Sequence, residues 1–267
     1  MFLEKNPNYF DTGICESHTV SKATGLVLCG NKVFLLFYST FLQRSYDQLL
    51  HDAARLNLNL TILLDRSDLA SNEGNSHHGI FDVTYLKSMP NTNLCSPRDF
   101  NQLNQLIDYY YDNNQNINII RYPTAPFMNL ELNNNYLINK NQFETLIDNN
   151  NETAILTYGP YTNVIYQNIV DQDVKVDLYN TIWINNLNED TVKQILTKYK
   201  TVIVYERIYS SNGMFSEINE LKNKYNLNTK LIPMNYKNFM GHGPIHVLDK
   251  KEKMNFDSIK ENIYNEQ

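Results

Sequence analysis

Short apolar runs alternate with longer segments of helical periodicity along most of the chain. In the first half, buried strands are predicted at Val33–Tyr38, Leu60–Leu64 and Ile117–Ile120. Helices are predicted around them at Ser45–Leu56, Asp82–Met89 and Arg98–Tyr111. Strands that are separated by helices indicate βαβ units and a parallel sheet.

The same alternation returns after a polar stretch that is rich in Asn. Strands are predicted there at Ala154–Thr157, Val174–Leu178, Thr201–Tyr205 and Thr229–Pro233. Helices are predicted at Tyr161–Val170, Glu189–Tyr199, Gly213–Tyr225 and Ser258–Tyr264. We therefore expect an α/β fold with two domains, 1–127 and 152–267, joined by an Asn-rich linker over 128–151.

Composition narrows the class of protein. The chain has 267 residues with 42% hydrophobic content, which suffices for two domains with buried cores. A formal net charge of -6 argues against nucleic-acid binding, which needs a basic face. The three cysteines form no CxxC pair, and no apolar segment has the length of a membrane span. We expect a cytoplasmic protein that binds neither nucleic acid nor a membrane.

The carboxyl ends of the predicted strands carry the polar candidates. Ligands of open α/β sheets bind outside these ends. Tyr38, Arg66 and Arg121 lie there, as does the loop over 68–79. This edge of the first sheet is therefore the predicted site.

Several stretches are specific enough to suggest a family. Residues 10–20 read Phe-Asp-Thr-Gly-Ile-Cys-Glu-Ser-His-Thr-Val, and residues 38–44 read Tyr-Ser-Thr-Phe-Leu-Gln-Arg. Residues 64–66 read Leu-Asp-Arg, residues 72–79 read Asn-Glu-Gly-Asn-Ser-His-His-Gly, and residues 121–123 read Arg-Tyr-Pro. In this order they resemble the pyrimidine-binding domain of the 1-deoxy-D-xylulose-5-phosphate synthase family, whose members are transketolase-like enzymes. The resemblance continues more weakly into a second domain that is similar to a transketolase C-terminal domain, most clearly at Tyr205-Glu206 and 233–243.

That resemblance implies an activity. Enzymes of the family use thiamine diphosphate to condense pyruvate with glyceraldehyde 3-phosphate, with loss of CO₂, in the synthesis of isoprenoid, thiamine and pyridoxal precursors. The resemblance also implies a homodimer or a complex with a separate diphosphate-binding subunit.

The resemblance assigns Glu16 and Phe41 to the cofactor. A glutamate hydrogen-bonded to N1′ of the aminopyrimidine favours the imino tautomer that removes the thiazolium C2 proton. Glu16 is expected to be partly buried in that role, whereas its simpler interpretation is a carboxylate at a helix start. Phe41 resembles the residue that stacks on the pyrimidine ring, and it could equally be an ordinary core aromatic.

The resemblance assigns a second set of residues to the substrates. The set comprises Tyr38, Arg44, Arg66, Glu73, His77 and Thr124. Guanidinium groups suit a phosphate because they stay charged and offer forked donors. His77 is also assigned a catalytic part, either as a proton relay to the substrate carbonyl or as the group that holds the pyruvate carboxylate. The alternatives are solvated arginines and, for His77-His78, a metal site that lacks a third ligand at suitable spacing.

The chain also departs from the family. The Gly-Asp-Gly…Asn motif that holds diphosphate and Mg²⁺ is absent, and the first βα unit of the pyrimidine-binding domain is missing. Glu73 replaces an aspartate, and Thr124 replaces an arginine. We expect a truncated or split synthase. The loss of the βα unit and of the arginine favours the alternative, a non-catalytic remnant or interaction subunit. A weaker alternative is the C-terminal subunit of a split transketolase or 2-oxoacid dehydrogenase.

Overall fold

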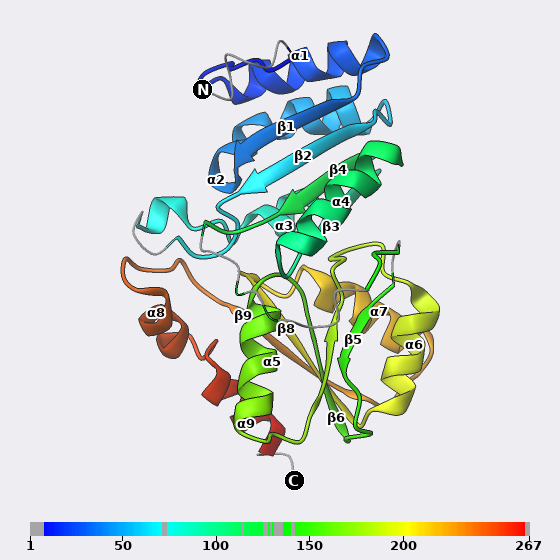
Figure 1. Ribbon diagram of the computed structural model, residues 1–267, viewed down its shortest axis with the longest axis vertical. Coiled ribbons are helices and arrows are strands. Elements are labelled where there is room, and N and C mark those ends of the chain that lie inside the picture. The colour runs from blue at the N-terminus through cyan, green and yellow to red at the C-terminus, as the bar shows by residue number, and fades with distance from the viewer. Residues whose placement is uncertain are drawn as a thin grey trace.

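The computed structural model describes residues 8–70, 74–113, 115–124, 128, 130, 136–139 and 142–264. They form two sheets, and Figure 1 shows the first above the second. No helix within these ranges is both long and apolar enough to cross a membrane.

The first sheet has four parallel strands in the order β1-β2-β4-β3. Their bounds are Val33–Tyr38 (β1), Leu60–Asp65 (β2), Thr92–Cys95 (β3) and Ile117–Arg121 (β4). Three of them were predicted from their apolar runs, and β3 was not. The helices of this domain are α1 (Glu16–Leu28), α2 (Ser39–Leu42), α3 (Asp82–Leu86) and α4 (Phe100–Asp112).

The segment after β1 differs from the single helix predicted at Ser45–Leu56. The chain passes from α2 into a 3₁₀ turn, η2 (Gln43–Ser45), and then into a π-helix, η3 (Gln48–Ala54). A second 3₁₀ turn, η4 (Asn75–His77), precedes α3. Short π segments occur often at functional sites, and this one follows directly on the residues predicted to hold the cofactor.

The second sheet has five strands in the order β5-β7-β6-β8-β9. Their bounds are Glu144–Ile147 (β5), Thr153–Thr157 (β6), Asp177–Asn180 (β7), Thr201–Tyr209 (β8) and Lys230–Tyr236 (β9). All pairs are parallel except β5 with β7. The surrounding helices are α5 (Tyr161–Asp171), α6 (Glu189–Lys198), α7 (Met214–Lys224), α8 (Ile245–Lys251) and α9 (Phe256–Tyr264).

The boundary between the domains is not the plain linker that the sequence suggested. Strand β5 lies inside 128–151 and pairs with β7, so the second sheet begins before residue 152. It was missed because its first residue, Glu144, is a buried carboxylate rather than an apolar side chain. Helix α8 was also missed.

The two domains share a core. One cluster of buried apolar side chains runs from Ile62 and Leu106 in the first domain to Trp183 and Leu196 in the second. A polar network crosses the same boundary, where the Arg98 guanidinium donates to both carboxylate oxygens of Glu144 at 2.9 and 3.0 Å. The two sheets are therefore joined through buried side chains as well as through the chain.

Candidate active site

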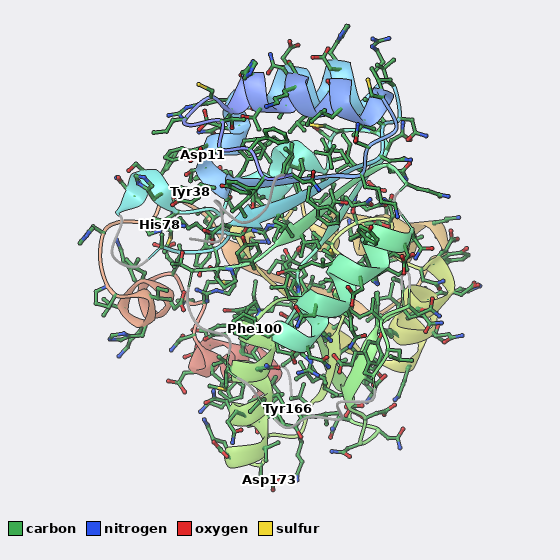
Figure 2. All side chains as sticks on the ribbon, turned by 45° about the horizontal axis from the view of Figure 1, so that its top comes forward. Asp11, Tyr38, His78, Phe100, Tyr166 and Asp173 are labelled. Carbon is green, nitrogen blue, oxygen red and sulfur yellow. The ribbon has the colours of Figure 1, made fainter. Side chains whose placement is uncertain are left out.

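The predicted site residues gather at the carboxyl ends of the first-sheet strands. Tyr38 ends β1, Arg66 follows β2, and α2 brings Phe41 beside them. The arrowheads of β1 and β2 point to this side of the molecule in Figure 1, and Tyr38 is labelled there in Figure 2. Tyr38, Phe41 and Arg66 therefore lie at the same edge of the first sheet.

Glu16 begins α1 and is 9% exposed. Its carboxylate accepts a hydrogen bond from the Arg44 guanidinium at 3.1 Å. The same guanidinium lies over the ring of Phe41, 4.7 Å from the ring centroid. Glu16 is thus both a helix-start residue and a buried carboxylate, and it is linked to Phe41 through Arg44.

Aromatic contacts extend this group toward the substrate candidates. Phe41 stacks on Tyr38 at a centroid distance of 5.6 Å, and the His77 ring meets Phe41 edge-on at 5.6 Å. The Arg66 guanidinium lies 3.8 Å from the centroid of the Tyr38 ring and pairs with the Asp65 carboxylate. Six predicted residues therefore form one continuous group of contacts: Glu16, Tyr38, Phe41, Arg44, Arg66 and His77.

One predicted residue that the structure describes is not brought into this group, and another is not described. Thr124 is exposed beyond the end of β4. Glu73 lies outside the described residues. Among the residues that the structure does describe, no cluster of three metal-ligating side chains occurs.

Arg121, which also lies at a strand end, has a structural part instead. Its guanidinium donates two hydrogen bonds of 2.8 Å to the Asp82 carboxylate, and both side chains are almost fully buried. Asp82 also accepts from the hydroxyls of Ser39 and Ser67 at 3.0 and 3.2 Å. This network anchors the starts of α2 and α3 beneath the site.

The loop that carries His77 is packed tightly against the site. A Cβ atom added at Gly79 would lie 2.2 Å from the carbonyl oxygen of Arg66 and 2.8 Å from the Cβ of Ser39. Only glycine allows this approach. The loop backbone at residue 79 therefore packs directly against Arg66 and Ser39.

The second domain holds a buried carboxylate, Glu206, which was noted in the sequence as a point of resemblance but was given no role. Glu206 on β8 accepts from the backbone amides of Met214 and Phe215 at 2.6 and 3.0 Å, and from the Tyr158 hydroxyl at 3.1 Å. Burial raises the pKa of Glu206, although these donors and Lys87 oppose the rise. Glu206 therefore caps the start of α7 rather than facing the predicted site.

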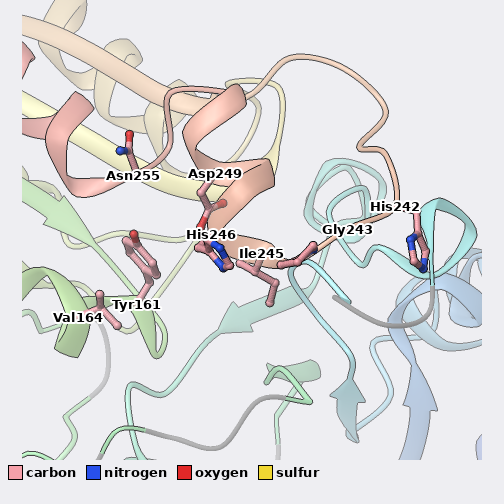
Figure 3. A pocket seen from close by; sticks show the side chains of 9 residues that line it. Tyr161, Val164, His242, Gly243, Ile245, His246, Asp249 and Asn255 are labelled. Carbon is pink, nitrogen blue, oxygen red and sulfur yellow. The ribbon is translucent and has the colours of Figure 1, made fainter.

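One cavity lies in the second domain, with a volume of about 590 Å³ (Figure 3). Tyr161, His246 and Asp249 line it, and His242 lies on the side that faces the first domain. None of the predicted site residues lines this cavity. A second cavity of about 20 Å³ lies between the domains, beside Asp68, Arg121 and Arg207.

Comparisons with known proteins agree with the geometry. Residues 2–127 match the family model described as "Transketolase, pyrimidine binding domain". The fold resembles a solved structure titled "Split gene transketolase, inactive beta4 tetramer", with a TM-score of 0.82 at 15% identity over 94% of this chain and 80% of that one. It also resembles transketolase from Campylobacter jejuni, with a TM-score of 0.74 at 12% identity over 96% of this chain and 39% of that one. Residues 2–127 therefore match the pyrimidine-binding domain of transketolases, and the chain as a whole is similar to transketolases in its fold.

Sequence identity points to a more specific group of relatives. The chain is 37% identical to 1-deoxy-D-xylulose-5-phosphate synthase of Malacoplasma penetrans over 94% of its own length and 41% of that protein. It is 31% identical to the Campylobacter jejuni enzyme of the same name over 96% of its length and 42% of that protein. The chain thus resembles these synthases along nearly its whole length, and it spans about two fifths of theirs.

Proposed function

We propose that this chain supplies the pyrimidine-binding and C-terminal domains of a thiamine-diphosphate-dependent 1-deoxy-D-xylulose-5-phosphate synthase. The reaction would condense pyruvate with glyceraldehyde 3-phosphate and release CO₂. The observation that carries the proposal is the contact between buried Glu16 and the Arg44–Phe41 pair, inside a chain that is 37% identical to such a synthase.

The residues at the site fit the pyrimidine half of the cofactor. The Glu16 carboxylate is buried and can accept a proton or hydrogen bond from a ring nitrogen. The Phe41 ring offers a face for stacking that Arg44 now covers. When bound, thiamine diphosphate supplies a nucleophilic carbon that the protein side chains lack. Glu16 would hold the proton at the pyrimidine nitrogen, and Phe41 would set the plane of the ring.

The neighbouring residues fit the substrates. Arg66 and Tyr38 form a cationic and aromatic wall beside Phe41, and a guanidinium suits the phosphate of glyceraldehyde 3-phosphate. His77 contacts Phe41 and is placed to transfer a proton at the substrate carbonyl. We assign Arg44, Glu73 and Thr124 to the same pocket on the resemblance alone.

The proposal includes a second protein part. A diphosphate-binding domain outside these 267 residues would hold the diphosphate and Mg²⁺, because the chain spans only about two fifths of the length of the synthases that it resembles. The solved split-gene transketolase, whose title describes an inactive β tetramer, supports this arrangement by its fold.

A second candidate is a non-catalytic interaction subunit. The exposed and uncharged Thr124, at a position where the synthases carry an arginine, favours it. The C-terminal subunit of a split transketolase is a weaker alternative, which rests on the likeness in fold.

Assays with pyruvate, glyceraldehyde 3-phosphate, thiamine diphosphate and Mg²⁺ test the proposal. We expect no turnover by this chain alone and turnover when a diphosphate-binding domain of a synthase is added. Turnover by the chain alone would refute the requirement for a second part. A reconstituted complex that binds cofactor but makes no product would favour the interaction subunit.

A further inference from the structure

The loop between β2 and α3 touches both domains. We call residues 66–70 and 74–81 the site loop, because they carry Arg66 and His77. Figure 1 shows this loop in cyan beside the orange segment that precedes α8. The close-up in Figure 3 shows His242 of that segment next to the cyan loop, and a Cβ added at Gly74 would lie 3.4 Å from the His242 ring.

Asp68 is the first contact of the site loop with the second domain. Its carboxylate accepts a hydrogen bond of 2.6 Å from Arg207 on β8. Arg207 is 7% exposed and is shared with Asp249 at 2.9 Å, so its position is fixed within the second domain. Asp68 in turn exchanges two backbone hydrogen bonds with Gly79, at 2.9 and 2.8 Å. The ion pair therefore fixes both ends of the segment that contains His77.

His78 is the second contact. Its Nδ1 accepts from the backbone amide of Ala70 at 3.0 Å, so Nε2 carries the proton and donates to the carbonyl oxygen of Gly241 at 2.9 Å. The preceding residue, His77, contacts Phe41 instead. Two adjacent histidines thus face different domains, and a shift of Gly241 would move the backbone that carries His77.

The end of the site loop makes the third contact. The amide of Tyr209 on β8 donates to the carbonyl oxygen of Ile80 at 2.8 Å. The Phe81 ring packs on Tyr209 and on Phe239 with centroid distances of 5.0 and 4.9 Å. The loop is consequently held by the second domain at three separate points.

We infer that the second domain positions the candidate site, with Asp68 and His78 as positioning residues for Arg66 and His77. The inference rests on the proposed function only in the roles of Arg66 and His77 toward the substrates. The geometric claim concerns the unliganded chain. It can therefore be tested whether or not the chain binds thiamine diphosphate.

A matched pair of variants at residue 78 separates the two bonds of His78. In His78→Gln the side-chain amide nitrogen can take the place of Nε2 and keep the bond to Gly241. In His78→Asn the side-chain amide oxygen can take the place of Nδ1, so only the bond to Ala70 is kept. Hydrogen exchange would be measured at the amides of Asp68, Gly79 and Tyr209, with Ile119 in β4 and Val202 in β8 as controls.

We expect His78→Asn to speed exchange at Gly79 about fivefold, which is the factor given by one lost hydrogen bond. Exchange at Ile119 and Val202 should not change. At Gly79, His78→Gln should stay close to the wild type, because it keeps the bond to Gly241 in the second domain and loses only the bond to Ala70 inside the loop. The ring NMR signals of His77 should shift in His78→Asn and not in His78→Gln. Asp68→Asn, which leaves Arg207 its Asp249 partner, should also speed exchange at Gly79.

Unchanged exchange at Gly79 in both His78→Asn and Asp68→Asn would overturn the inference. So would equal effects of His78→Asn and His78→Gln on the His77 ring. A failure of the proposed function would appear differently, as absence of cofactor binding in a chain whose site loop still responds to these variants.

Discussion

The Arg44 guanidinium donates to the Glu16 carboxylate at 3.1 Å while it lies over the ring of Phe41. Arg44 therefore links the two residues that were predicted to hold the pyrimidine ring, although the resemblance placed it with the substrate residues. Arg66 lies over Tyr38 instead. The two arginines thus cover different aromatic rings of the group.

Replacement of Arg44 by Gln should change stability little. The Arg44 side chain is 53% exposed, so its ion pair with Glu16 is screened by water. We expect the free energy of unfolding to fall by less than about 1 kcal/mol in a urea titration. Arg44→Lys is the matched control. A loss of several kcal/mol would show that Arg44 is part of the core.

Replacement of Arg98 by Met should be much more costly. Arg98 and Glu144 are both nearly fully buried, so the change leaves Glu144 without its strongest partner. We expect a loss of about 3–5 kcal/mol in the free energy of unfolding. Fluorescence of Trp183, the single tryptophan, reports the transition because it packs on Tyr109 and Tyr110 across the domain boundary.

The double variant Arg98→Met, Glu144→Gln is the control for that loss. Removing both charges should recover part of the stability, because Glu144 is then no longer a buried carboxylate without its arginine. The recovery should be incomplete, since Asp99 also loses its ion pair with Arg98 and keeps only the backbone amide of Gln102. Equal stability of the single and double variants would contradict this account of the boundary.

Glu206 should make stability depend on pH. Burial raises its folded-state pKa above the usual 4.5, so the folded state holds the proton more tightly than the unfolded state does. The stability that Glu206 contributes is therefore full below the unfolded pKa and is lost as pH rises through the folded pKa. In Glu206→Gln this loss is absent.

Urea unfolding of both proteins from pH 4 upward measures the effect. The difference in unfolding free energy should move in favour of Glu206→Gln as pH rises. The change of this difference with pH is the test. Its absolute size is not, because the side chain in Glu206→Gln also lacks one of the carboxylate oxygens that cap α7. A constant difference, or one that moves in favour of the wild type, would contradict the prediction.

Replacement of Thr124 by Arg should strengthen phosphate binding in the reconstituted enzyme. A charge-assisted hydrogen bond would be worth about 10-fold to 100-fold in the KM for glyceraldehyde 3-phosphate. Thr124→Gln adds length without charge and should leave KM unchanged. If the arginine has no more effect than Gln, residue 124 lies outside the substrate pocket.

The sequence predicted the strands that are apolar runs, since β1, β2 and β4 begin where expected. It missed β3, whose residue Asn93 is buried only because its side chain bonds to Asn118 on β4 at 2.9 Å. Strand β7 lies later than predicted, because buried Asp177 is satisfied by Tyr199 and Asn151. Polar residues enter a core only with partners, and those partners are distant in the sequence.

The same limit applied to the site. The motif residues could be named because each lies within a short, specific stretch, and the structure brings six of them together. The contact of Asp68 with Arg207 joins residues that are 139 positions apart, and no local pattern marks either of them. The contacts between the second domain and the site loop therefore could not be predicted from the sequence.

The most direct test of the account is a calorimetric titration of thiamine diphosphate, with Mg²⁺ and the added diphosphate-binding domain, into the wild type and Glu16→Gln. If the Glu16 carboxylate contacts the pyrimidine ring, the variant should bind about 10-fold to 100-fold more weakly. Equal affinity of the two proteins would contradict the central claim that Glu16 holds the cofactor.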